Sequence, residues 1–229
     1  MSAKKKDAKK SQDNVTRNIV IGTVAFVLIF VGGGIALSKQ SESKISQAIP
    51  SSVDESNGYG ITFNKGLAGV PKIDIYEDFQ CPFCKQFESA NLKYIESLIT
   101  EKKAEVTYHL LSFVGPESVV AANAAACAAD ENQFLSFHGT MYANQPANEN
   151  SGEWSKERVL AIGEAAGISS QSFIECVGSD KYVGWVQKVA VAANEAKIQS
   201  TPTVLINGKD LKDTANIYDP NQFRKAVEG

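Results

Sequence analysis

A Cys-Pro-Phe-Cys run at residues 81–84 lies where a strand pattern changes to a helical pattern, and this feature most restricts the possible folds. Before it, residues 71–79 (PKIDIYEDF) alternate apolar and polar side chains, which predicts a strand. From Cys81 onward apolar residues recur at three- and four-residue offsets, which predicts a helix beginning at the first cysteine. Residues 104–113 are a second strand candidate. Together these segments predict a strand–helix–strand unit whose two strands are parallel.

The rest of the chain predicts a sheet interrupted by a block of helices. Further strand candidates are residues 61–63 and 201–211, and Asn207-Gly208 marks a hairpin turn within the second of these. Helical patterns occupy 118–143, 155–167, 170–177, 181–198 and a final segment that Asp219 caps and Pro220 begins. The predicted order is β-β-α-β, a helical block, and β-β-α. We therefore expect an α/β fold with a helical insertion.

Residues 19–37 form a run of nineteen uncharged residues. A helix of this length spans about 28 Å, close to the hydrocarbon thickness of a bilayer. Six basic residues precede the run and only Lys39 and Lys44 closely follow it, so positive-inside bias places the N-terminus in the cytoplasm and the folded domain outside. The six are Lys4, Lys5, Lys6, Lys9, Lys10 and Arg17.

Alternatives to a membrane anchor exist for this apolar run. A cleaved signal peptide has a shorter apolar region, of about 7–15 residues, although GIA (34–36) and ALS (36–38) fit small-x-small cleavage sites. A buried core helix disagrees with the four glycines of the run and with its lack of a polar face. No cysteine lies at its end, which excludes a lipoprotein anchor. An uncleaved single-pass anchor is the preferred interpretation.

The predicted organisation has four parts. Residues 1–18 form a basic cytoplasmic tail, 19–37 the transmembrane helix, 38–57 a flexible linker with seven serines, and 58–229 the folded domain, with its helical insertion at about 115–198. The tail carries a charge of +4, which leaves −7 on the rest of a chain whose net charge is −3. Basic charge on a tail rather than on the folded domain argues against a nucleic-acid partner.

The cysteine pair allows three kinds of chemistry. Structural zinc usually takes four ligands from two paired clusters, but the chain has one Cys-x-x-Cys and two scattered histidines, His109 and His138, which we expect to be ordinary packed or surface residues. No metal site is therefore predicted. A purely structural bridge between Cys81 and Cys84 would close a very small loop and add little stability. Redox chemistry is the remaining interpretation.

The position of the pair at a helix start suits redox chemistry. The sulfur of Cys81 would lie beside the unpaired N–H groups and the positive end of the helix dipole, which stabilise a thiolate. Pro82 fits the first helical position, where a missing N–H costs nothing. Cys84 lies one turn further in, where it can resolve a mixed disulfide. We expect Cys81 to be the attacking cysteine and Cys84 the resolving one.

Residues 71–88, the later QSTPTVLING (199–208) and the order of elements between them resemble the membrane-anchored, DsbA-like thiol–disulfide oxidoreductases of the Gram-positive and actinobacterial type. The resemblance covers nearly all of residues 58–229 and implies a thioredoxin-like fold. It implies that Pro202 is cis and lies against the pair, with the Thr201 backbone meeting an extended substrate chain.

The same resemblance implies cofactor and partner assignments. No soluble cofactor is needed. The substrates would be unfolded exported proteins with cysteine thiols, and the reoxidant a quinone-linked membrane protein of the DsbB or VKOR type. Some relatives carry a second, non-catalytic disulfide in the insertion, which implies a bridge between Cys127 and Cys176; the alternative is two buried free thiols.

The chain departs from the family pattern at two positions. Ile75 stands where thioredoxins carry a buried Asp, and Phe83 stands where the best-known DsbA proteins have a histidine that stabilises the thiolate. We expect Phe83 either to enlarge an apolar rim with Phe79 and Phe113 or to join the core with them. Glu77 and Asp78 precede the pair and are expected to be surface acids.

The preferred function is the introduction of disulfide bonds into exported proteins. The enzymatic alternative is a disulfide reductase or isomerase, for example in cytochrome maturation, because both directions use the same atoms. The alternative from another class is a tethered peptide-binding or chaperone-like module whose cysteines are incidental.

Overall fold

The computed structural model describes residues 45–211 and 215–229, of which residues 46–229 belong to one compact unit. The predicted basic tail and transmembrane helix lie outside the described residues. Within 45–211 and 215–229, no helix is both long enough and apolar enough to cross a bilayer. The membrane anchor therefore stays a prediction.

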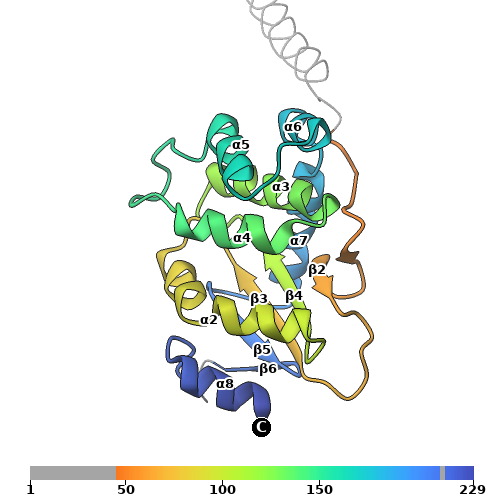
Figure 1. Ribbon diagram of the computed structural model, residues 1–229, viewed down its shortest axis with the longest axis vertical. Helices are drawn as coiled ribbons and strands as arrows, with labels where there is room; N and C mark the ends of the chain where they lie inside the picture. Colours follow the sequence, from red (N-terminus) through yellow and green to blue (C-terminus); the bar gives the residue numbers. More distant parts are fainter. Residues whose placement is uncertain (1–44, 212–214) are drawn as a thin grey trace, which may run out of the picture. The chain divides into compact units, whose positions relative to one another are not determined.

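A six-stranded sheet forms the centre of this unit (Figure 1), in the order β1-β2-β4-β3-β5-β6. The strands are β1 (Val53–Asp54), β2 (Gly60–Phe63), β3 (Lys72–Glu77), β4 (Glu105–Leu110), β5 (Thr203–Ile206) and β6 (Lys209–Asp210). β3 and β4 are parallel, with Ile75 opposite Tyr108, and the other neighbouring strands are antiparallel. The helix α2 (Pro82–Thr100) connects β3 to β4, so the predicted strand–helix–strand unit is confirmed.

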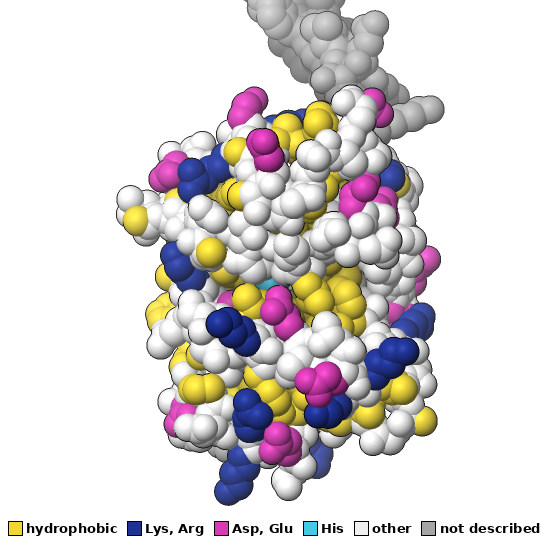
Figure 2. Space-filling view, in the orientation of Figure 1, with side chains coloured by type: hydrophobic (Ala, Val, Ile, Leu, Met, Phe, Trp, Pro, Cys, Tyr) yellow, Lys and Arg dark blue, Asp and Glu magenta, His cyan; other side chains and the backbone are white. Residues whose placement is uncertain are grey.

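The helical insertion lies between β4 and β5. Its helices are α3 (Pro116–Asp130), α4 (Phe134–Ala143), α5 (Lys156–Ala165), α6 (Gln171–Gly178) and α7 (Val183–Glu195), and α8 (Pro220–Glu228) closes the chain. In Figure 1, α3 to α6 gather above the sheet while α2 and α8 lie below them. On the face drawn in Figure 2, basic and acidic side chains are interspersed rather than separated by sign.

Local signals at two element ends act as predicted. The Asp219 side chain caps α8 by accepting from the backbone N–H groups of Asn221 at 2.9 Å and Gln222 at 3.4 Å. Asn207 and Gly208 have φ values of 51° and 76°, which the hairpin between β5 and β6 requires.

The predicted linker is partly wrong. Residues 46–57 belong to the folded unit, where β1 pairs with β2 and the side chains of Ala48, Ile49 and Val53 pack against the core. Asp54 is buried and its carboxylate lies 3.1 Å from the Lys65 ammonium. Three apolar side chains and one strand pairing outweigh the serine-rich composition that predicted a tether.

Cys127 and Cys176 form a disulfide, as the family resemblance implied. Their sulfurs are 2.06 Å apart and their Cα atoms 5.8 Å apart. The bond joins the last turn of α3 to the C-terminal half of α6, and both cysteines are buried. The bridge therefore fixes two helices of the insertion to one another.

Candidate active site

The cysteine pair lies at the start of α2, immediately after β3. Cys81 is the N-cap residue and Pro82 occupies the first turn, as predicted. Both thiols are free; Cys81 is 6% exposed and Cys84 is fully buried. The outer cysteine is therefore the one that a second protein chain reaches first.

The pKa values of the two thiols are shifted in opposite directions. The pKa of Cys81 is lowered to about 6 by hydrogen bonds from the Cys84 thiol, the Thr201 side chain and the backbone N–H groups of Cys84 and Phe83, which together outweigh burial. Burial raises the pKa of Cys84, and hydrogen bonding to Cys81 and the charge of Glu77 raise it further. Cys81 is therefore a thiolate at neutral pH and Cys84 a thiol.

We expect the reduced protein to show one thiolate titration with a pKa near 6, measured by absorbance at 240 nm. Cys84 should stay protonated throughout the accessible range. In Cys84→Ser the hydroxyl is a different donor from the thiol, so the Cys81 pKa should shift while staying below the ordinary cysteine value of about 8.5. A Cys81 pKa at that ordinary value in the unmodified protein would contradict this assignment.

The Thr201–Pro202 peptide bond is cis, as predicted. The Sγ atom of Cys81 lies 3.4 Å from the carbonyl oxygen of Thr201, so this loop lies directly against the pair. Beside it is a cavity of about 410 Å³. Its lining includes Phe83, Thr201, Pro202, Ile217 and Tyr218. The site therefore joins a nucleophilic sulfur to an open, largely apolar groove.

The three phenylalanines of the expected rim differ in exposure. Phe83 is 59% exposed and Phe113 45% exposed, whereas Phe79 is 1% exposed and belongs to the core. The apolar rim is thus confirmed for Phe83, which lines the groove, and the core alternative is correct for Phe79; Phe113 is exposed but is not part of the groove lining.

Asp78 is buried, so its prediction as a surface acid is wrong. Its carboxylate accepts hydrogen bonds from the Gln80 backbone N–H at 2.9 Å, the Ser118 hydroxyl at 2.7 Å and the Val114 backbone N–H at 3.0 Å. These donors come from the active-site loop and from the start of the insertion. Asp78 therefore fixes the loop before Cys81 to the insertion, a role for which the Asp-x-Gln spacing is only a weak signal.

Gln145 supports the same loop and was missed in the sequence. Its side-chain amide donates to the carbonyl oxygens of Phe79 at 2.7 Å and Cys81 at 3.0 Å. Gln145 follows α4, sixty-four residues after Cys81, and local sequence pattern carries no sign of this contact.

Glu77 is also fully buried, contrary to the surface prediction. It belongs to a cluster with Glu88 and His138 whose ligand-type atoms all lie within 4.8 Å of one another. His138 Nε2 lies 2.5 Å from Glu77 Oε1. Two atoms bound to one metal ion lie about 3 Å or more apart when each bond is ~2.0–2.2 Å long, so this distance fits a hydrogen bond rather than a metal site.

Burial governs the ionisation of this cluster. It raises the pKa of Glu77 to about 8 and that of Glu88 well above its ordinary range, and it lowers the pKa of His138. Burial therefore favours the neutral form of all three groups. His109, the other histidine, is packed as expected: it stacks on Tyr76 at 4.0 Å and lies 3.3 Å from Asp74.

A cysteine pair at the start of a helix, beside a cis-proline and on a mixed sheet, defines the class of thioredoxin-fold thiol–disulfide oxidoreductases. The chain belongs to the thioredoxin family, because the model of that family matches residues 68–228. The thioredoxin-like fold implied by the two motifs is therefore confirmed.

Known proteins of similar sequence and structure confirm the DsbA-like resemblance. The MdbA thiol-disulfide oxidoreductase of Actinomyces oris is 26% identical with a TM-score of 0.69, covering 82% of this chain and 96% of that one. DsbA of Mycobacterium tuberculosis shares the fold, with a TM-score of 0.61, 24% identity and coverage of 74% and 90%. Disulfide bond formation protein D of Bacillus subtilis is 25% identical over 67% of this chain and 69% of its own length.

Some similar proteins are much longer. The Na(+)/H(+) antiporter NhaA 1 of Salinispora arenicola is 29% identical over 62% of this chain, but the match spans only 21% of the antiporter.

Proposed function

We propose that this protein introduces disulfide bonds into exported proteins. The observation that carries the proposal is the stabilised thiolate of Cys81, for which the structure provides thiol, side-chain and backbone donors. Because a thiolate stabilised in the reduced form makes reduction of the pair more favourable, the pair is a better oxidant than one whose thiols keep their ordinary pKa.

The mechanism follows from the low pKa of Cys81 and the high pKa of Cys84. A substrate thiolate attacks Cys81 Sγ of the oxidised pair; a substrate–Cys81 bond forms, the Cys81–Cys84 bond breaks and its electron pair goes to Cys84, which takes up a proton. A second substrate thiolate then attacks the substrate sulfur and releases Cys81 as a thiolate. The substrate loses two electrons and the cysteine pair gains them.

The groove beside Thr201 and Pro202 suits an extended chain with little side-chain selectivity. Its backbone groups can pair with a peptide, and Phe83 adds an exposed apolar surface next to the nucleophile. Unfolded proteins with free thiols are the substrates that this arrangement fits.

The proposed location is the outer side of the cell membrane, with the N-terminus in the cytoplasm. Support comes from the apolar run at residues 19–37 and from the Cys127–Cys176 disulfide, since disulfides persist in oxidising compartments. A membrane reoxidase, quinone-linked and of the DsbB or VKOR type, would restore the pair. The competing direction is that of a reductase or isomerase.

The reduction potential of the Cys81–Cys84 pair distinguishes an oxidase from a reductase. The full chain in mild detergent is equilibrated with glutathione mixtures and its free thiols are trapped. We expect a potential that is more oxidising than the value of about −270 mV for thioredoxin, in the direction of the value of about −120 mV for DsbA. A value near that of thioredoxin would contradict the oxidase assignment and favour the reductase.

A further inference from the structure

The side chain of Gln145 reaches from the insertion to the backbone on both sides of Gln80. Gln145 follows α4 and is 9% exposed. Its amide nitrogen donates to the carbonyl oxygen of Phe79 at 2.7 Å and to that of Cys81 at 3.0 Å. One amide therefore holds two carbonyl groups of the turn that leads into the redox pair.

The contact with Cys81 falls on a peptide unit that has few other constraints. The unit between Cys81 and Pro82 has no N–H, because proline lacks one, so the carbonyl is its only hydrogen-bonding group. This carbonyl accepts from the Lys85 backbone N–H at 3.2 Å, which is the first hydrogen bond of α2. The Gln145 amide is a second donor. The orientation of this peptide plane therefore depends on one bond from α2 and one from the insertion.

The orientation of that plane decides where the first turn of α2 points. Cys81 has a φ of −70° and a ψ of 120°, the extended conformation of an N-cap residue. Rotation about ψ turns the start of α2 relative to the Cys81 sulfur. This sulfur accepts hydrogen bonds from the Cys84 thiol and from the backbone N–H groups of Cys84 and Phe83, all on α2. A less fixed ψ angle would move these donors away from the sulfur and weaken the thiolate.

Gln145 and the loop after it are themselves held in place. The Gln145 backbone N–H donates to the Tyr142 carbonyl oxygen at 3.3 Å, and the Gln145 carbonyl oxygen accepts from Lys85 Nζ at 3.4 Å. Further along the loop, the Asn150 backbone N–H donates to the side-chain oxygen of Gln80 at 2.7 Å. Gln145 thus reaches into the active-site turn, and Gln80 reaches from the turn into the same loop of the insertion.

We propose that Gln145 is a positioning residue for Cys81: by holding the Cys81 carbonyl, it keeps the first-turn N–H groups of α2 directed at the Cys81 sulfur, so that the helical insertion supports the nucleophile. The inference rests on the proposed function and deepens it. Buried carbonyl groups need donors in any fold, so a structural role alone would also place an amide here. A structural role affects stability only, whereas positioning also changes the ionisation of Cys81.

Gln145→Met tests the proposal, because it removes the donor but keeps a long, unbranched side chain. The Cys81 thiolate of the reduced protein is titrated by its ultraviolet absorbance. We expect the midpoint to rise by about one pH unit from the unmodified pKa of about 6, because the donors on α2 then stabilise the thiolate less well. In equilibrium with glutathione, the constant for reduction of the pair should fall by up to about tenfold near pH 8, since one pKa unit is a factor of ten.

The titratable groups that act on Cys81 keep their places in this variant. They are Cys84 on α2, Glu77 at the end of β3 and Tyr218 before α8. The Lys85 ammonium contacts the Gln145 backbone, which the substitution leaves unchanged. Because methionine adds no charge, a shifted titration reports the lost hydrogen bonds rather than a new electrostatic interaction.

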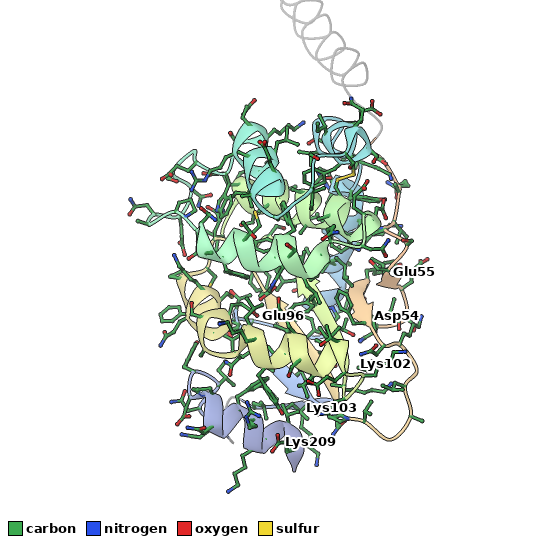
Figure 3. The ribbon with its side chains drawn as sticks, in the orientation of Figure 1. Asp54, Glu55, Glu96, Lys102, Lys103 and Lys209 are labelled. Atoms are coloured by element: carbon green, nitrogen blue, oxygen red, sulfur yellow. A yellow bond between two sulfur atoms is a disulfide. The ribbon has the colours of Figure 1, made fainter. Side chains whose placement is uncertain are left out.

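Asn64→Gly is the matched control. Asn64 acts near the opposite end of α2, which Lys102 and Lys103 follow in Figure 3. Its amide also donates to two carbonyl oxygens, those of Ile99 at 2.8 Å and Ala104 at 3.0 Å. Asn64 has a φ of 57°, which glycine adopts without strain. This variant should lose stability but titrate like the unmodified chain.

Gln145→Asn is a milder second variant, which keeps the amide on a side chain one carbon shorter. It should raise the midpoint by less than Gln145→Met, and it carries the test if Gln145→Met does not fold. An unshifted titration in the folded Gln145 variants would overturn the inference, as would an equal shift in Asn64→Gly. A potential like that of thioredoxin in the unmodified chain would instead contradict the proposed function, while the effect of Gln145 on the titration would still be measured.

Discussion

Replacing Cys81 by serine should abolish thiol–disulfide exchange. Cys81 is the thiol at the N-terminus of α2 whose charged form is stabilised, and Cys84 is fully buried behind it. A serine hydroxyl cannot form the mixed disulfide. We therefore expect the rate of oxidation of a two-cysteine model peptide to fall by at least ~10³-fold, the scale typical of losing a catalytic nucleophile. Mass spectrometry of the peptide measures this directly.

Cys84→Ser is the informative partner of this variant. It keeps the attacking sulfur but cannot resolve the intermediate, so the disulfide-bonded adduct between Cys81 and the peptide should accumulate while turnover stops. Full turnover or cellular function in Cys81→Ser would contradict the redox assignment and favour a tethered peptide-binding module.

The parts of the fold that could be predicted are those whose signals are local. The alternation in residues 71–79, the helical offsets after Cys81 and the Asp219-Pro220 start of the last helix each lie within one element, and each element formed as expected. The linker prediction failed at residues 46–57 because Ile49 and Val53 pack against the core of the domain, and the composition of the segment does not show that contact.

The same distinction between local signals and distant contacts applies to the candidate active site. The cysteine pair and the cis-proline are motifs, and the structure brings them to a sulfur–oxygen distance of 3.4 Å. Glu77 and Asp78 looked like surface acids because local sequence does not show what covers them. The insertion covers them: His138 is sixty-one residues from Glu77, and Ser118 is forty residues from Asp78.

Removing the Cys127–Cys176 disulfide should be the largest single loss of stability. The bridge closes a loop with a sequence separation of 49, for which the chain-entropy model predicts about 4 kcal/mol. We expect Cys127→Ala/Cys176→Ala to lower the free energy of unfolding by that order, measured by urea denaturation. Both positions are buried, so alanine also removes two packed sulfurs and adds to the loss.

Reduction provides the matched comparison for this effect. A mild reductant that opens Cys81–Cys84 but leaves the buried bridge intact should not destabilise the protein, because the loop closed by two cysteines three positions apart is very small and the reduced form gains the stabilised Cys81 thiolate. The bridge joins α3 to α6, and α3 also carries the Ser118 hydroxyl that holds Asp78 below the active-site loop. If the double variant kept the stability of the unmodified chain, the packing of the Ala-rich helices, not the bridge, would be what holds that support in place.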